Sequence, residues 1–207
     1  MGRNPQRCLV QIITLRLSVK RCSSATVEST RAQKITVPGP IIMTIIKTHR
    51  LTLKHLGHGD MARLVELIGV AEVALNLAGV PHPYTLSDAE DWLARVKESP
   101  FNLSIFLDDE LIGGVGLSDR ANGTYELGYW LGVDYWGRGF ATEAAAGLLD
   151  FVALQTRPLS VVATVFKDNV ASDKVLRKLG FTPTGTGELF SLSRQAQVAT
   201  FNYSYTA

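Results

Sequence analysis

The segment from Val133 to Ala144 reads VDYWGRGFATEA, and it decides how the chain folds. It leads from the end of an apolar strand, through a loop with two glycines, into the start of a helix. Such a loop exposes successive backbone N–H groups at a helix N-terminus, where the helix dipole also favours an anion. Gly137 and Gly139 let the backbone approach a phosphate without a Cβ in the way, and Ala141 is small for the same reason. The segment therefore predicts a phosphate-binding loop.

Two better-known phosphate loops do not fit this segment. No Gly-Lys-Ser/Thr follows the glycines, which excludes a Walker loop. The third glycine of the dinucleotide-binding fingerprint is absent, and the preceding strands read as an antiparallel meander. A plain strand-to-helix turn is the simpler alternative, but Arg138 between the two glycines favours an anion site.

The rest of the chain predicts strands and helices in a definite order. Apolar alternation predicts strands at residues 50–54, 101–107, 111–117, 124–133, 159–166, 187–192 and 198–205. Four helices are predicted. The first begins after Asp60, the second begins at a capping box of Ser87 and Glu90, and the other two span residues 141–153 and 169–179. The buried face of the third helix should consist of Ala144, Ala145, Leu148, Leu149 and Val152. This order predicts an α/β fold with one mixed, mostly antiparallel sheet flanked by helices, in which a crossover helix makes two central strands parallel.

Three segments resemble the GNAT N-acetyltransferases, and they occur in the family's order. The family's loop motif is Gln/Arg-x-x-Gly-x-Gly/Ala, and residues 136–141 (WGRGFA) match it except at the first position, where Trp136 stands. Residues 125–131 (YELGYWL) resemble the strand before the loop in the branch that includes the RimJ/RimL-type ribosomal-protein acetyltransferases. Asn169 and Ser172, followed by Leu-Gly-Phe at 179–181, resemble the signature after it. The likeness covers roughly residues 44–205.

The resemblance implies a GNAT-like sheet whose central parallel strands splay apart and hold acetyl-CoA. The implied pyrophosphate-binding residues are Gly137, Arg138, Gly139, Phe140, Ala141 and Thr142. The pantetheine arm would run beside Leu131, Gly132 and Val133, with Asn169 as a hydrogen-bonding partner. Cations must recruit the 3′-phosphate locally because residues 43–207 are net acidic, and the candidates are Arg138, Lys174, Arg177 and Lys178. A solvated helix face explains the last three equally well.

Two residues are candidates for the chemistry of acetyl transfer. An α-amine has a pKa of about 7.7–8.0 and a lysine amine about 10.4, so a general base is useful. Glu126 shares a strand face with two glycines and could take the proton through a water, although a solvated strand Glu is as good a reading. The tyrosine acid of many GNAT enzymes is replaced by Leu176, and the branch resemblance offers Ser172 as the group that hydrogen-bonds the sulfur. The alternative is that Ser172 only caps its helix.

Residues 1–42 form a basic extension whose composition differs from that of the domain at 43–207. Seven basic residues and one acid lie in the extension, whereas fourteen basic and eighteen acidic residues follow it. It ends in a linker-like Val37-Pro38-Gly39-Pro40. A transit peptide, a disordered arm and upstream sequence translated from too early a start all explain this composition. Met43, which opens a strand-like segment, favours the third explanation.

The composition of the whole chain indicates a globular protein. Its 207 residues are 46% hydrophobic and 19% charged, with a net charge of +2, so neither a nucleic acid nor a membrane partner is indicated. No apolar run approaches the roughly 20 residues needed to cross a bilayer. Cys8 and Cys22 both precede the domain, which excludes a cysteine nucleophile within it. The four histidines lack zinc-site spacing, so no metal is predicted.

We therefore expect an N-acetyltransferase that moves the acetyl group of acetyl-CoA directly to a primary amine. The acceptor would be a protein N-terminal α-amine or a small-molecule amine, bound near residues 78–85 and the last hairpin. A non-catalytic acyl-CoA-binding sensor or scaffold is the alternative. A nucleotide-phosphate enzyme would need Mg²⁺ ligands beside the loop, where only Asp134 is near. A cytoplasmic monomer or homodimer is expected, with organellar import through the extension as the alternative.

Overall fold

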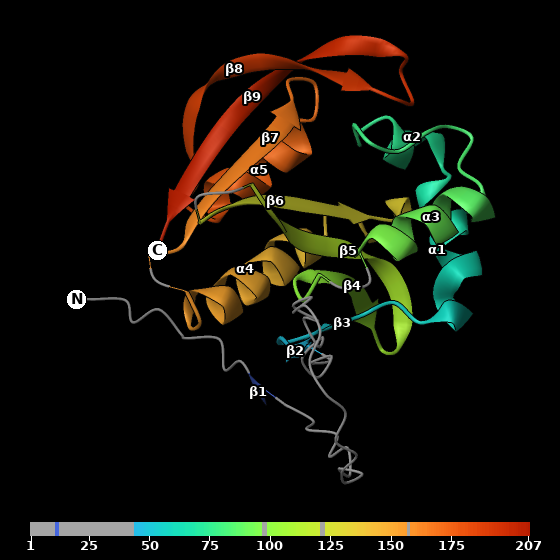
Figure 1. The fold of residues 1–207 in the computed structure, drawn as a ribbon, viewed down its shortest axis with the longest axis horizontal. Helices are drawn as coiled ribbons and strands as arrows, with labels where there is room; N and C mark the ends of the chain where they lie inside the picture. The colour runs from blue at the N-terminus through green and yellow to red at the C-terminus, as the bar shows by residue number, and fades with distance from the viewer. Residues whose placement is uncertain (1–10, 13–43, 97–98, 121–122, 157) are drawn as a thin grey trace, which may run out of the picture.

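The fold is built on one strongly curved sheet (Figure 1). The computed structural model describes residues 11–12, 44–96, 99–120, 123–156 and 158–207. Within these residues, the strands follow the order β1-β2-β3-β4-β5-β6-β7-β9-β8 across the sheet. Their bounds are β1 Gln11–Ile12, β2 Ile45–Lys47, β3 Thr52–Lys54, β4 Asn102–Leu107, β5 Glu110–Asp119, β6 Thr124–Leu131, β7 Ser160–Phe166, β8 Thr182–Ser191 and β9 Ala196–Thr206. Among the strands of the described residues, only β6 and β7 pair in parallel, which confirms the predicted mixed, mostly antiparallel sheet.

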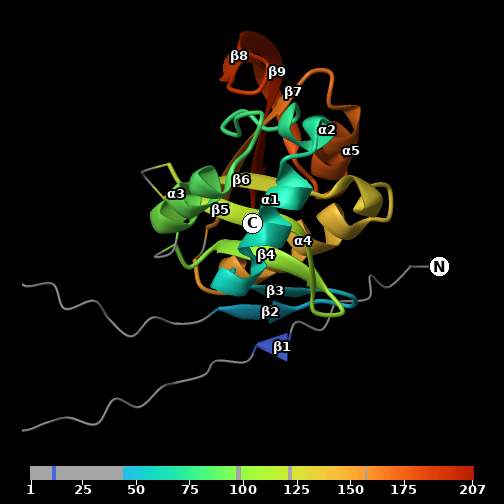
Figure 2. The same cartoon turned by 90° about the vertical axis from the view of Figure 1, so that its right-hand side faces the viewer.

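Helices cover both faces of the sheet, with α3 on one side and α4 on the other (Figure 2). Their bounds are α1 Met61–Ile68, α2 Ala71–Ala74, α3 Leu86–Val96, α4 Phe140–Ala153 and α5 Val170–Lys178. The first helix begins after Asp60, as predicted, and Gly180 follows the last helix with a φ of 87°. The one-turn α2 was not predicted. Met43, the expected start of the domain, lies outside the described residues, and so does most of the turn expected at residues 121–123.

The capping box of α3 differs from the predicted one. Thr85 and Asp88 form it: the Thr85 N–H donates to Asp88 Oδ2 at 2.8 Å, and the Asp88 N–H donates to Thr85 Oγ1 at 3.3 Å. The predicted pair, Ser87 and Glu90, has the same spacing, so spacing alone could not choose between them. The earlier start adds Leu86 and Ser87 to the helix, whose buried residue is Ala89.

The buried face of α4 attaches the helix, and therefore the loop before it, to the sheet. The five residues predicted for this face are all buried: Ala144, Ala145, Leu148, Leu149 and Val152. Burying a leucine side chain contributes about 1.5–3 kcal/mol relative to exposure. The start of α4 is thereby held at a fixed position against β5 and β6.

The parallel strands β6 and β7 separate after a short paired stretch. Their register runs through three pairs and ends at Glu126 with Val162. Beyond that point residues 127–131 of β6 and 163–166 of β7 line opposite sides of a cleft. The sheet stays continuous because β5 pairs with residues 125–131 of β6 and β9 pairs with residues 160–166 of β7. The predicted splay of the central parallel strands is confirmed.

Candidate active site

The cleft between β6 and β7 has a volume of about 410 Å³. Its walls come from the two strands, from the start of α4 and from α5. Val73 of α2, residues 76–78 after that helix and Leu189 of β8 complete the lining. Of the segments expected to bind an acceptor, Ala78 and the last hairpin contribute, whereas residues 79–85 do not line the cleft. We call this space the β6–β7 cleft.

The predicted phosphate loop lies at one end of the β6–β7 cleft. Gly137 and Gly139 have φ values of 70° and 81°, in the left-handed region that side chains with a Cβ adopt at a cost. The first backbone hydrogen bond of α4 runs from the Glu143 N–H to the Gly139 carbonyl at 3.0 Å. The N–H groups of residues 140–142 precede it and have no partner within the helix. These donors, at the positive end of the helix dipole, fit a pyrophosphate.

The loop is tied to the end of β6 by Trp136, the residue that departs from the family's motif. Its indole N–H donates to the Leu131 carbonyl at 2.8 Å. Leu131 lines the cleft, but Gly132 and Val133 do not. The Gly132 N–H donates to the Ile112 carbonyl at 2.9 Å and is therefore engaged within the sheet. Val133 begins a single 3-10 turn, η2 Val133–Tyr135, that leads into the loop.

A second tie fixes the loop from the outside. The Arg50 guanidinium donates to the Arg138 carbonyl at 3.1 Å and to Glu143 Oε2 at 2.7 Å. Arg50 and Arg138 both place their guanidinium groups over the Phe140 ring, at 4.4 and 4.8 Å from its centroid. Arg138 therefore packs on the loop, and it is not one of the residues that line the cleft. Sequence reasoning missed Arg50, which lies far from the loop in sequence.

Helix α5 supplies the wall opposite β6. Asn169 is its N-cap, and the Asn169 Oδ1 accepts from the Ser172 N–H at 3.0 Å, which leaves the carboxamide NH₂ for a ligand in the cleft. Of the cations predicted to meet the 3′-phosphate, Lys174 and Lys178 line the cleft. Arg177 does not, since its guanidinium pairs with Asp173 Oδ2 at 3.0 Å.

Ser172 lies inside the cleft, and its hydroxyl does not cap the helix, because Asn169 does. The Ser172 Oγ instead lies 2.7 Å from the hydroxyl of Tyr129 on β6. Burial is the main cause that raises the pKa of Tyr129, to about 12, so this phenol stays protonated at neutral pH. Tyr129 was not singled out from the sequence. Its only signal was alternation, which places it on the same strand face as the buried Leu127 and Leu131.

Glu126 lies at the last paired position of β6, where the two strands begin to diverge. Its carboxylate forms an ion pair with Arg120, whose Nε lies 2.8 Å from Oε2. The carboxylate is not among the groups that line the cleft, and a proton could reach it only through a bridging molecule. The structure therefore brings Ser172 and Asn169 into the cleft and leaves Glu126 at its apex.

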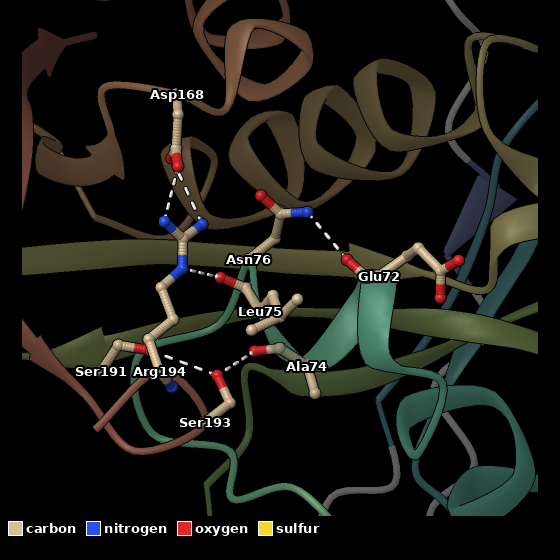
Figure 3. Close-up of polar contacts among 8 residues, drawn as sticks. All are labelled: Glu72, Ala74, Leu75, Asn76, Asp168, Ser191, Ser193 and Arg194. Atoms are coloured by element: carbon tan, nitrogen blue, oxygen red, sulfur yellow. Dashed lines mark hydrogen bonds and ion pairs between the residues drawn. The ribbon is translucent and has the colours of Figure 1, made fainter. Parts of the chain in front are cut away.

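The tip of the hairpin of β8 and β9 is bound to the end of α2 and to the residue after it (Figure 3). The tip consists of residues 191–195. Within it, the Ser193 hydroxyl donates a hydrogen bond to the Ala74 carbonyl at 2.9 Å, and the Arg194 Nε–H donates one to the Leu75 carbonyl at 2.7 Å. The Arg194 guanidinium also binds Asp168 at 2.5 Å and, through this hydrogen bond, lowers the pKa of that carboxyl. These contacts join α2, the hairpin tip and the loop before α5 into a bridge over the cleft.

Two properties of the described residues bear on other classes of protein. No group of three or more His, Cys, Asp and Glu residues lies together in a way that could hold a metal ion. No helix in the described ranges is long and apolar enough to cross a membrane.

A splayed parallel strand pair, with a glycine loop at the N-terminus of the crossover helix, is the arrangement that the resemblance to the GNAT acyltransferases implied. The sequence model of the family described as "Acetyltransferase (GNAT) domain" matches residues 50–182. The chain belongs to this family and is an acetyl-CoA-dependent acyltransferase.

Curated relatives agree with this assignment. "Uncharacterized N-acetyltransferase p20" of Bacillus licheniformis is 31% identical over 155 residues, covering 69% of this chain and 85% of the relative. "L-amino acid N-acetyltransferase AaaT" of Escherichia coli is 26% identical over 148 residues, covering 69% and 89%. The "Ribosomal-protein-serine acetyltransferase" of Escherichia coli is 32% identical over 83 residues, covering 39% and 46%. The relatives named N-acetyltransferases support acetyl transfer in general.

Solved structures share the fold at lower sequence identity. A GNAT acetyltransferase from Bacillus anthracis superposes with a TM-score of 0.70 at 20% identity, covering 79% of this chain and 98% of that one. The microcin C7 self-immunity acetyltransferase MccE, solved with acetyl-CoA and AMP, superposes with a TM-score of 0.67 at 22% identity. The match covers 77% of this chain and 93% of that one. RimL, a ribosomal L7/L12 α-N-protein acetyltransferase solved with coenzyme A, superposes with a TM-score of 0.68 at 19% identity. The match covers 78% of this chain and 97% of that one. At these identities, the likenesses show that the chain shares the fold of these enzymes, among them a RimL protein.

Proposed function

We propose that this enzyme transfers the acetyl group of acetyl-CoA to a primary amine in a single ternary complex. The observation that carries the proposal is the β6–β7 cleft, which has unpaired helix N–H groups at one end and the Ser172 hydroxyl in its wall. Residues 43–207 contain no cysteine, so the domain has no thiol to carry an acetyl group between two half-reactions.

The proposed reaction has one bond made and one bond broken at the acetyl carbonyl carbon. The amine nitrogen attacks this carbon, the carbon–sulfur bond breaks, and the amine loses a proton. Glu126, at the apex of the splay, accepts that proton through a water. Ser172 donates a hydrogen bond to the departing sulfur, and the backbone donors at the start of α4 hold the pyrophosphate.

The proposed acceptor is an α-amine, either of a protein N-terminus or of an amino acid. An α-amine has a pKa of about 7.7–8.0, so a good part of it is already neutral near pH 7.5, unlike a lysine amine at about 10.4. A base that acts only through a water, as we propose for Glu126, suits the less basic amine better. The names of two relatives, an L-amino acid acetyltransferase and a ribosomal-protein-serine acetyltransferase, support both forms of this class.

The test is turnover by the purified full chain with acetyl-CoA, followed by a thiol reagent that detects released coenzyme A. The amine panel contains free amino acids, short peptides with free N-termini, the same peptides with blocked N-termini and an internal lysine, and a polyamine. We expect release only with α-amines. Binding of acetyl-CoA without release for any amine would instead support the non-catalytic sensor, and lysine-only activity would overturn the acceptor class.

A further inference from the structure

The Tyr129 and Ser172 hydroxyls form a hydrogen-bonded pair across the β6–β7 cleft. Tyr129 comes from β6 and Ser172 from the first turn of α5, and the two hydroxyl oxygens lie 2.7 Å apart. Both residues line the cleft, and the tyrosine ring is packed against the core. The pair therefore joins the two walls between which the resemblance places the pantetheine arm.

The direction of this hydrogen bond follows from the number of available protons. The Tyr129 hydroxyl has one proton and two acceptors within reach, the Ser172 Oγ at 2.7 Å and the Ser172 carbonyl at 3.1 Å. The carbonyl is already an acceptor within α5, as every carbonyl in a helix interior is. Donation to the closer Oγ is therefore favoured. Because the Ser172 Oγ then accepts the tyrosine proton, its own hydroxyl proton cannot also lie between the two oxygens. That proton is free to point into the cleft.

The relative acidities of its members disfavour proton transfer from Tyr129 through the pair to a thiolate. A thiol has a pKa of about 8.5, whereas burial, as the main cause, raises the pKa of Tyr129 to about 12. Moving the tyrosine proton onto a thiolate would therefore be uphill by more than three pKa units. The pair can stabilise a thiolate by hydrogen bonding, but it does not protonate one.

We propose that Tyr129 is a positioning residue for acyl transfer, which holds the Ser172 hydroxyl so that its proton faces the sulfur leaving the acetyl group. The proposal rests on the proposed function, because it needs a thioester sulfur in the cleft.

The experiment measures the thiol pKa of bound coenzyme A, which needs binding but no turnover. The ultraviolet absorbance of the thiolate is followed against pH for the wild type, Tyr129→Phe, Ser172→Ala and the double variant. The matched control is Tyr125→Phe, on the same strand but outside the lining of the cleft. Melting temperatures and acetyl-CoA affinities of all five proteins are measured alongside.

If Tyr129 orients Ser172, the wild type holds the bound thiol pKa below about 8.5, and both single variants raise it. The double variant should resemble Ser172→Ala alone, because the tyrosine acts only through the serine. With an accepted amine, kcat should fall about 5- to 30-fold in Tyr129→Phe while KM for acetyl-CoA stays within about twofold, as expected for one hydrogen bond of about 1–2 kcal/mol.

Two results would overturn the proposal. One is a thiol pKa unchanged by Tyr129→Phe but raised by Ser172→Ala, which would make the tyrosine a packing residue. The other is a fully additive double variant, which would mean that the two hydroxyls act separately. If Tyr129→Phe folds poorly, Tyr129→Leu, judged by the same thiol titration, replaces it as a smaller variant without a hydrogen-bonding group. Failure of all amines to react, with the thiol shift intact, would instead overturn the proposed function alone.

Discussion

The carboxylate of Glu143 is held by both the main chain and the side chain of Arg50, 93 positions away in the sequence. The Arg50 N–H donates to Oε1 and the guanidinium to Oε2, each at 2.7 Å, and Thr48 adds a third bond to Oε1 at 2.7 Å. Because Arg50 also binds the Arg138 carbonyl, the segment between β2 and β3 fixes the geometry of the phosphate loop.

Glu143→Gln should weaken both the fold and cofactor binding. The Glu143 side chain is only 14% exposed, and an amide cannot accept all three of the present hydrogen bonds. We expect a loss of about 1–3 kcal/mol in unfolding free energy, by chemical denaturation, and a weaker affinity for coenzyme A by calorimetry. Asp109→Asn is the matched control, since its carboxylate is 95% exposed. Equal behaviour of the two variants would show that the Arg50 contact holds nothing in place.

The same carboxylate predicts part of the acid sensitivity of the fold. Burial alone would raise the pKa of Glu143, but hydrogen bonds from Thr48 and Arg50 outweigh it and hold the pKa below the ordinary 4.5. A carboxyl whose pKa is lower in the folded state stabilises the fold above its unfolded pKa, and this contribution disappears as the pH falls through the folded value. The gap in melting temperature between wild type and Glu143→Gln should therefore narrow below about pH 4.5. A gap that widens on acidification would contradict this.

Gly139→Val should remove coenzyme A binding. Gly139 has a φ of 81° at the N-cap of α4, where a β-branched residue costs roughly 1–2 kcal/mol or more and distorts the loop that presents the backbone donors. An added Cβ also meets the Arg50 guanidinium at 3.5 Å. The control is Gly59→Val, where an added Cβ meets nothing within 4 Å and φ is not in the left-handed region. Calorimetry with coenzyme A checks the prediction after circular dichroism has shown that both variants fold. Full affinity in Gly139→Val would place the pyrophosphate elsewhere.

Glu126→Gln tests the proposed base. The variant should keep its affinity for coenzyme A, because Glu126 lies at the apex of the splay and away from the phosphate loop. Its rate should fall by about 10²–10⁴ near pH 7, and the loss should shrink as the amine deprotonates at higher pH. The control is Glu188→Gln on the exposed strand β8. Full activity near pH 7 would mean that the ion pair with Arg120 is the whole role of this carboxylate.

A chain that begins at Met43 should fold and turn over like the full chain. The composition changes before this residue, and the described contact between the two parts is β1 with β2, at two residue pairs. Thermal melting and the coenzyme A release assay on both chains check the expectation. Loss of folded protein in the shorter chain would show that residues 1–42 contribute to the stability of the domain.

Contiguous features of the site were predictable from the sequence, and features joined across the fold were not. The crossover helix and the glycine loop lie within one segment of about 40 residues, so periodicity and glycine spacing define them. The Tyr129–Ser172 pair spans 43 positions and the Arg50–Glu143 pair spans 93. Alternation indicates which face of a strand a residue occupies, but it does not indicate which helix lies opposite that face.

The bridge between the hairpin tip and α2 has a consequence for the order in which the site assembles. Ser193 and Arg194 each bind a carbonyl 119 positions earlier, whereas β6, α4, β7 and α5 are consecutive. Contacts between distant parts of a chain form late in folding, because the intervening loop must first be closed. During refolding, the side of the cleft built from β6, α4, β7 and α5 should therefore form first. The contacts between the hairpin tip and α2 should form last.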